Sequence, residues 1–478
     1  MSTPTDGRTS SRRTSRRRSE RPSRRPDASA LTAAALVLLA VVAVLLTMSS
    51  EAVRSVGPKQ TGAVVSHSVA SCPTAQAPAG TSRFAAGVAP GRGLSSSGSV
   101  RQGPRAGSGN PLDLQRGQVM RLTGVQSSPV LTGEDGLAAG LFGFRADQSG
   151  SLLGAAPCPA PRAGWWFSGA GAGLDHASTL VMSNIDPGPA VVDLDVLGPD
   201  GPVDTVGTRG ITIAPGSSKT VKLSDIAPQT DELTLGVEAS RGRVVASVTD
   251  QFSARPGGEP GWAWLSGDVS PDRVVRLAGL PDAASSRTLL VANPSDSEAV
   301  VDVQVAGSSG SFVPAGVDQQ TVAPGSVASI ELPRQVGRKE AVAVRLGSQV
   351  PVLATVRSVA AGDTSYASPV VPLTGAAAAP VLPKVSSTVQ LTAGAKNGSA
   401  EVVAYDESGR RVDGQDLKVP AKATVAWSPK RGAAYVVVTP TSGHLYGATV
   451  YQGKGVEAYP LTALPIRFVQ PAVTPAVR

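Results

Sequence analysis

The chain has 478 residues and a formal net charge of +8, with 53 Gly, 39 Pro and only 4% aromatic residues. This length allows about three domains at roughly 150 residues each, and the composition suits many short strands and turns better than long helices. The first 27 residues hold nine Arg and three acidic residues, so they carry six of the eight net charges and leave +2 for the other 451 residues. Because residues 28–478 are nearly neutral, the positive charge belongs to the N-terminal tail and not to the whole chain.

An apolar stretch follows the basic tail. Residues 28–50 contain no ionisable side chain, and about 20 apolar residues span the hydrocarbon core of a membrane as a helix. We therefore predict a disordered basic cytoplasmic tail over 1–27 and a single transmembrane helix over 28–50, with the rest of the chain outside, because Arg residues gather on cytoplasmic flanks. The span explains the charge, so we expect no nucleic-acid partner. A cleaved signal peptide, which would release a secreted form, is the alternative.

The next region, 51–162, is rich in Gly, Pro and Ser, and it contains both cysteines of the chain, Cys72 and Cys158. An even count of cysteines outside the membrane favours one disulfide over two free thiols. The stretch 87–110 has almost no large apolar residue and indicates a mobile linker or a long loop. We predict a β-poor region here, with a few strand-like segments that the disulfide helps to hold together.

A duplication follows: residues 179–217 align without a gap with residues 288–326, and sixteen of the thirty-nine pairs are identical. The offset of 109 residues is that of a domain. Alternating apolar positions and frequent turn signals within it are typical of a β-sandwich. We predict an all-β protein of tandem immunoglobulin-like β-sandwich domains behind the transmembrane helix, which would form a rod-like ectodomain. The predicted boundaries are 163–270 for the first repeat, 271–375 for the second, 384–466 for a degenerate third, and 467–478 for a C-terminal tail.

Residue patterns that carry catalysis are missing from the sequence. The three histidines lie in different predicted regions, and neither a nucleophile elbow nor a zinc-binding helix nor a phosphate-binding loop is present. We therefore expect no enzyme activity, no catalytic residue, no cofactor and no metal. An acidic cluster that would suit calcium consists of Asp193, Asp195, Asp200 and Asp204. The second repeat does not preserve this cluster, so solvated carboxylates are the simpler interpretation.

Tryptophan is rare in the chain, and four of its five copies stand just ahead of the repeats: Trp165, Trp166, Trp262 and Trp264. Exposed indole rings would stack on sugar rings, which makes these residues candidate ligand contacts. The alternative is a place in the core of a sandwich or between domains, because large aromatic side chains dominate burial. The sequence leaves both interpretations open.

Several segments together resemble the actinobacterial domain-of-unknown-function 5719 family of membrane-anchored exported proteins. They are the basic tail with its single span, the segment 158–167 (Cys-Pro-Ala-Pro-Arg-Ala-Gly-Trp-Trp-Phe), and the segments 289–294 and 322–326 of the second repeat. No activity is assigned to that family. The resemblance therefore implies an exported, envelope-associated protein and transfers no role to any residue.

These observations lead to one expected function and one alternative. We expect a non-enzymatic, single-pass membrane protein of the cell envelope that acts as an extracytoplasmic interaction or scaffold protein, with envelope proteins or wall glycans as partners. The alternative is a carbohydrate-binding module that acts in envelope glycan assembly. Loss of glycan binding on Trp substitution, with folding intact, would favour the alternative.

Overall fold

The computed structural model describes residues 62–74, 80–123, 128–268 and 270–468. These residues hold thirty-six strands, one short 3-10 helix and no α-helix, so the described protein is all-β, as the composition predicted. The basic tail and the predicted transmembrane helix fall in residues 1–50 and lie outside the described residues. Within the described ranges, no helix is long and apolar enough to cross a membrane.

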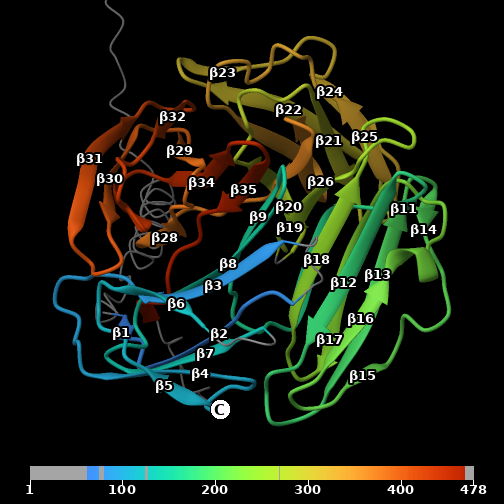
Figure 1. Cartoon of the computed structure of the whole chain (residues 1–478). Coiled ribbons are helices and arrows are strands. Elements are labelled where there is room, and N and C mark those ends of the chain that lie inside the picture. The colour runs from blue at the N-terminus through green and yellow to red at the C-terminus, as the bar shows by residue number, and fades with distance from the viewer. Residues whose placement is uncertain (1–61, 75–79, 124–127, 269, 469–478) are drawn as a thin grey trace, which may run out of the picture. The chain divides into compact units, whose positions relative to one another are not determined.

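The strands form four units that share one plan of eight main strands in two sheets (Figure 1). Numbered by position within a unit, one sheet has the order 1-6-3-4 and the other has the order 5-2-7-8. Buried Val, Leu and Ala residues from both sheets fill the space between them, as in a β-sandwich. An immunoglobulin constant domain has the sheets ABED and CFG, so the units share its sandwich architecture but have a different strand order.

The first unit occupies the region that we predicted to be β-poor. Its strands are β2 (His67–Ser71), β3 (Thr81–Val88), β4 (Gly98–Gly103), β5 (Asn110–Leu112), β6 (Val119–Leu122), β7 (Val130–Asp135), β8 (Leu141–Ser149) and β9 (Leu152–Pro157). The expectation of a β-poor region with a linker over 87–110 is wrong, because small residues here serve packing. A Cβ added at Gly87 would lie 2.4 Å from the ring of Phe142, so the glycine makes room for that ring.

The second and third units contain the duplicated residues. The second unit has β10 (Gly164–Ala170), β11 (Ala172–Gly173), β12 (His176–Ser183), β13 (Ala190–Gly198), β14 (Gly201–Pro202), β15 (Ile211–Ile213), β16 (Ser218–Lys222), the 3-10 helix η1 (Leu223–Asp225), β17 (Leu233–Arg241), β18 (Val245–Phe252) and β19 (Gly261–Leu265). The third unit has β20 (Asp272–Leu277), β21 (Ser286–Ala292), β22 (Ala299–Gly307), β23 (Gly310–Phe312), β24 (Gln319–Val322), β25 (Val327–Glu331), β26 (Ala343–Ala360) and β27 (Asp363–Ala367). In the third unit, the single long strand β26 fills the sixth and seventh positions and therefore belongs to both sheets.

The fourth unit repeats the plan without matching the duplicated sequence closely. Its strands are β28 (Ala377–Pro380), β29 (Ser386–Ala393), β30 (Gly398–Tyr405), β31 (Arg411–Val419), β32 (Thr424–Trp427), β33 (Tyr435–Ser442), β34 (Leu445–Gln452) and β35 (Val456–Pro460). A short pair outside the four units, β1 (Ala63–Val64) and β36 (Arg467–Phe468), joins the two ends of the described chain.

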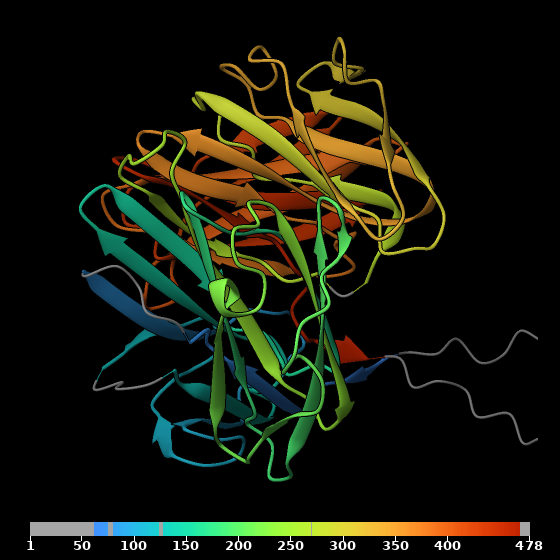
Figure 2. The same ribbon diagram turned by 90° about the vertical axis from the view of Figure 1, so that its right-hand side faces the viewer.

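The four units close on one another, because the fourth returns to the first. The rings of Phe142 and Tyr435, from the first and fourth units, lie 5.5 Å apart within a hydrophobic cluster that both units share. The eighth strands β9, β19, β27 and β35 also contact one another in turn, with β35 against β9. The labels of β9, β19 and β35 lie together near the centre of Figure 1, and Figure 2 shows the same molecule from its side. The expectation of a rod-like row of units is therefore wrong. It assumed that neighbours in sequence touch only each other, whereas apolar sheet faces of the first and last units also bury one another.

Candidate binding cleft and the buried polar centre

Two buried carboxylates hold the four eighth strands together. The side chain of Asp363, on β27, accepts four backbone N–H groups. Its Oδ1 accepts from Trp262 (3.0 Å) and Thr364 (2.9 Å), and its Oδ2 accepts from Leu153 (2.9 Å) and Val456 (3.1 Å). One carboxylate therefore binds β9, β19 and β35 as well as its own strand, and it satisfies donors that would otherwise be buried without acceptors.

Glu457, on β35, supplies the second carboxylate. Its Oε2 lies 3.4 Å from the backbone nitrogens of Ala155 and Trp264, and its Oε1 accepts from Ala458 at 2.8 Å. Burial raises the pKa of Asp363 to about 6, against the opposing effect of its N–H donors, and it raises the pKa of Glu457 well above the usual range. We call these two carboxylates and the N–H groups that they accept the carboxylate centre.

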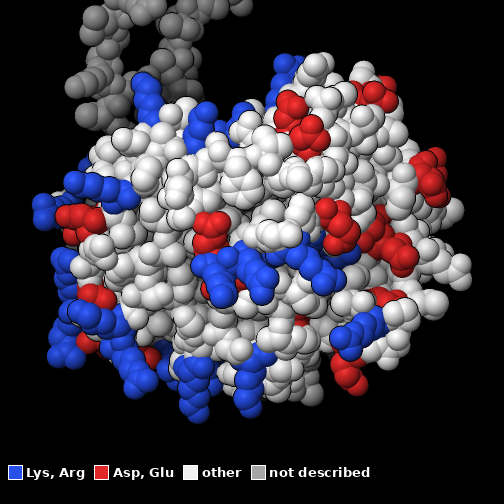
Figure 3. Space-filling model, turned by 90° about the horizontal axis from the view of Figure 1, so that it is seen from above, with Lys and Arg blue, Asp and Glu red and all other residues white. Residues whose placement is uncertain are grey.

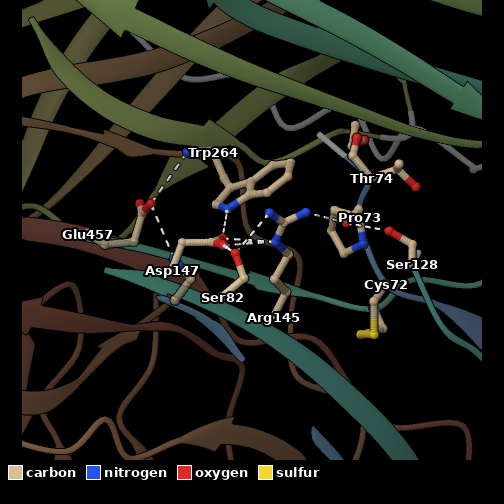
Figure 4. A network of polar contacts seen from close by, with 12 residues as sticks. Cys72, Pro73, Thr74, Ser82, Ser128, Arg145, Asp147, Trp264 and Glu457 are labelled. Carbon is tan, nitrogen blue, oxygen red and sulfur yellow. Dashed lines mark hydrogen bonds and ion pairs between the residues drawn. A yellow bond between two sulfur atoms is a disulfide. The ribbon is translucent and has the colours of Figure 1, made fainter. Parts of the chain in front are cut away.

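A third buried acid, Asp147, lies near this centre in a fully paired network (Figure 4). Its carboxylate accepts hydrogen bonds from Nε–H of Arg145 at 3.0 Å and from Nε1–H of Trp264 at 3.1 Å. Arg145 also donates to the carbonyl of Pro73 at 3.0 Å. The guanidinium lies over the Trp264 ring, 5.0 Å from its centroid. Because each charge has its partner inside the protein, the network links the first and second units and presents no reactive group to solvent.

The second and third units share a further network around Asp250. Its carboxylate lies 3.0 Å from Nε2 of His176, and it accepts the hydroxyls of Ser178 and Tyr366. Burial opposes the charged imidazole, but the charge and hydrogen bond of Asp250 outweigh that effect and raise the pKa of His176. A Ser, a His and an Asp thus meet, yet His176 is only 2% exposed and Ser178 donates to the acid instead of to the imidazole. A nucleophile needs an adjacent base and access to substrate, so this group is structural.

Three of the four candidate tryptophans are core residues. The exposed fractions of Trp165, Trp262 and Trp264 are 3%, 1% and 2%. Their interpretation as ligand contacts is corrected accordingly: the rings fill the second unit and its junction with the first, where Trp262 and Trp264 meet edge to face at 5.4 Å. Only Trp166 is partly exposed, beside a cavity of about 680 Å³.

The structure also shows the positions of the two cysteines and of the acidic cluster. Cys72 and Cys158 form a disulfide within the core of the first unit. In the acidic cluster, Asp195 pairs with Arg209 at 2.7 Å and Asp193 accepts the N–H of Gly210 at 2.6 Å. In the part of the chain that the structure describes, no three His, Cys, Asp or Glu side chains gather in a way that could hold a metal ion.

An open cleft of about 930 Å³ lies between the first and fourth units. Its charged lining consists of six basic and two acidic residues: Arg83, Arg121, Lys384, Arg410, Lys430, Arg431, Asp406 and Glu407. Basic side chains also predominate on the left of Figure 3, the side on which the fourth unit lies in Figure 1. A chain whose body carries a net charge of only +2 thus concentrates positive charge in one concave place.

The basic residues of the cleft fall into two groups. Three of them form ion pairs: Arg121 with Glu407 at 3.4 Å, Arg410 with Asp406 at 2.9 Å, and Lys430 with Asp413 at 3.3 Å. The hydrogen bond from Ser408, together with Arg410, lowers the pKa of Asp406 to about 2. Three further cations make no hydrogen bond or ion pair with the side chain of any described residue: Arg83, Lys384 and Arg431. We call these three the free cations of the cleft.

Sequence reasoning missed both the carboxylate centre and the cleft. The signal for the first was an acidic residue inside an otherwise apolar strand, Glu457 between Val456 and Ala458. The cleft has no local signal, because its lining residues come from strands and loops about 300 positions apart, as Arg83 and Lys384 show. Only the contact between the first and fourth units brings them together.

The fold and these sites define an all-β protein of four sandwich units, with structural buried charges and an open basic cleft. The chain belongs to a family of unknown function (DUF5719), whose model matches residues 123–430. This match begins within the first unit and ends within the fourth, so it includes the complete second and third units. No curated protein matches the chain.

Proposed function

We propose that this chain is a non-enzymatic, membrane-anchored interaction protein of the cell envelope, with its body on the outer side of the membrane. The apolar stretch 28–50 and its basic flank support the anchor and its orientation. The disulfide between Cys72 and Cys158 supports an oxidising compartment. Cleavage after the same apolar stretch would give a secreted form with the same body. We also propose that the units are immunoglobulin-like in the broad sense of a two-sheet sandwich.

One contrast carries this proposal. Three described groups that could perform acid–base chemistry, His176, Asp363 and Glu457, are buried and hydrogen-bonded within the protein. The large cleft is open instead, and its three free cations pair with no side chain in the described part of the chain. Groups of the first kind stabilise a fold, and groups of the second kind suit recognition, because an unpaired surface cation gains most from an acidic ligand.

The cleft also narrows the class of partner. An acidic envelope protein or a charged wall glycan would match its free cations. The aromatic residues of the lining, Phe84 and Phe144, are half-buried and buried, so the lining offers no exposed ring on which a nucleic-acid base could stack. We therefore propose an acidic partner and not a nucleic acid.

Proximity labelling from the C-terminus of the full chain, in intact cells, tests the proposal. A cleft variant carries Arg83→Gln, Lys384→Gln and Arg431→Gln. A matched control carries Lys219→Gln, Lys222→Gln and Arg241→Gln, which removes three exposed charges from the second unit. We expect envelope partners for the wild type and the control, and their loss for the cleft variant. Identical partners for all three chains, or turnover of an envelope substrate by the purified protein, would contradict the proposal.

The alternative is a carbohydrate-binding module, and the hydroxyl groups of the cleft favour it. The exposed serines that line the cleft are Ser386, Ser408 and Ser428. Sugar recognition by hydroxyls persists at high salt, whereas attraction between exposed charges is screened within about 3 Å at 1 M salt. Retention of the full chain on purified wall polysaccharide at high salt would therefore favour the alternative over a purely electrostatic partner.

A further inference from the structure

A second groove, of about 300 Å³, lies between the third and fourth units and is separate from the cleft. Arg276 on β20 and Arg345 on β26 line it from the third unit. Lys422, in the turn between β31 and β32, and Tyr446, on β34, line it from the fourth. The lining contains three cations and no acidic residue. Its volume is at the lower end of the range, about 300–1,000 Å³, that is typical of small-molecule sites.

The two arginines stand directly opposite each other in an antiparallel pair of strands. Like charges in such a pair destabilise a sheet unless something neutralises them. Arg276 lies over the ring of Tyr446, 4.4 Å from its centroid, and the charge of Asp272, on the same strand, acts favourably on its guanidinium. Among the described residues, neither guanidinium makes a hydrogen bond or an ion pair with a carboxylate. The site therefore lacks a negative charge.

The third cation sits in a strained backbone conformation. Lys422 has φ +57°, and it occupies the turn position at which the other three units have Gly117, Gly216 and Gly325, with φ +89°, +70° and +67°. As Gly216 does to Asn184, Lys422 donates its N–H to the residue that follows the second strand of its unit, Gly394. A side chain at positive φ costs about 1 kcal/mol or more, and such outliers gather at functional positions.

We propose that this groove binds a small ligand that carries a phosphate or carboxylate group. The guanidinium groups of Arg276 and Arg345 hold the oxyanion with paired N–H donors, and the ammonium of Lys422 completes its charge neutralisation. Gln304 and Tyr446, which also line the groove, contact the uncharged part of the ligand. This inference goes beyond the proposed function, because it concerns a different site and a ligand of small size.

Two variants separate a binding role from a structural one. Lys422→Gly restores the residue that the other units have, so it removes the cation without creating strain. Arg345→Gln removes one charge of the like-charged pair. Lys339→Gly is the matched control: Lys339 also has positive φ, +65°, but it is exposed and lies outside the groove. We expect each of the three variants to keep or raise the Tm.

Binding of the full chain is measured by calorimetry with four probes: inorganic phosphate, glucose 1-phosphate, glucuronate and uncharged glucose. We expect the charged sugars to bind, glucose not to bind, and Lys422→Gly and Arg345→Gln to weaken binding by about tenfold or more while the control binds like the wild type. The ratio of glucose 1-phosphate to glucuronate affinity then assigns the oxyanion. The inference is overturned if no charged probe binds better than glucose, or if the two groove variants bind like the control. Neither result bears on the cleft, so the proposed function is judged separately.

Discussion

The asparagine that the duplication preserves braces a turn. Asn184 is 1% exposed, and its Nδ2 donates to the carbonyls of Gly188 (2.8 Å) and Ile213 (3.0 Å). Asn293 is fully buried and makes the equivalent bonds to Ser297 (2.7 Å) and Val322 (3.1 Å). In both units the amide ties the loop after the second strand to the fourth strand. The role of this asparagine in the fold explains why both copies of the duplication keep it.

Substitution Asn184→Ala tests this role. It leaves two carbonyls and the N–H of Asp186 without their partner. We expect the free energy of unfolding to fall by about 2–3 kcal/mol, since buried groups that lose a partner carry their full desolvation penalty. Chemical denaturation measures the change. Asn110→Ala, at an exposed position in β5, should leave stability within about 0.5 kcal/mol. Equal midpoints for the two variants would show that the amide does not support the turn.

At the scale of elements, the eighth strand of each unit determines how the units meet. It lies at the end of its sheet, so one edge has N–H groups that no strand of the same unit accepts. Such an edge normally needs cover. The carboxylate centre accepts these N–H groups from neighbouring units, and Gly154 on β9 lets the Trp262 ring approach, because an added Cβ would lie 2.2 Å from that ring.

The carboxylate centre predicts a pH dependence. The pKa of Asp363 is raised from 3.8 to about 6, so folding takes up a proton between these values. Its contribution to stability is therefore greatest below about pH 4 and is lost as the pH rises through about 6, by about 3 kcal/mol at most. The raised pKa values of Glu457 and His176 also make the free energy of unfolding decrease as the pH rises. The lowered pKa of Asp406 changes the stability only below about pH 4.

Denaturation of the full chain between pH 4 and pH 7 measures this slope. We expect the free energy of unfolding to decrease across the window in the wild type. Asp363→Asn should be less stable overall, because its NH₂ group faces N–H donors, and should show a smaller slope. Asp416→Asn, at an exposed position, is the control. If the Asn variant does not fold, the wild-type slope alone decides, and stability that increases from pH 4 to pH 7 would contradict the assignment.

Close packing between eighth strands gives a second prediction at this scale. Gly154→Ala should destabilise the protein by about 1–3 kcal/mol, because the Trp262 ring must move within a packed core. Gly188→Ala is the matched control, since an added Cβ there meets nothing within 4 Å. A thermal melt compares the two. A Gly154→Ala variant as stable as the control would mean that the strands do not need this contact.

The sequence predicted what depends on local pattern. The alternation of Val192, Leu194 and Val196 gave β13, and the 109-residue duplication gave two units with the same plan. What the sequence did not predict depends on contacts across the chain. Glycine in the first unit was interpreted as flexibility, although Gly87 makes room for a ring. The burial of Trp262 and the carboxylate centre arise only when strands of different units meet.

At the scale of the whole described molecule, closure of the four units explains where recognition can occur. The eighth strands bury the titratable groups at the centre, and the meeting of the first and fourth units leaves the cleft with its free cations. A row of units would have kept Arg83 far from Lys384. The basic cleft is thus a consequence of closure, and the proposed interaction depends on it.

Site-specific photo-crosslinking in intact cells tests this claim most directly. A photoreactive residue replaces Ser386, which is exposed in the cleft, or Ser309, which is exposed in the third unit outside it. We predict that the full chain with the probe at 386 forms an adduct with an acidic envelope partner, and that Arg83→Gln with Lys384→Gln abolishes the adduct. The probe at 309 should form none. No adduct at 386, or the same adducts at both positions, would contradict the account.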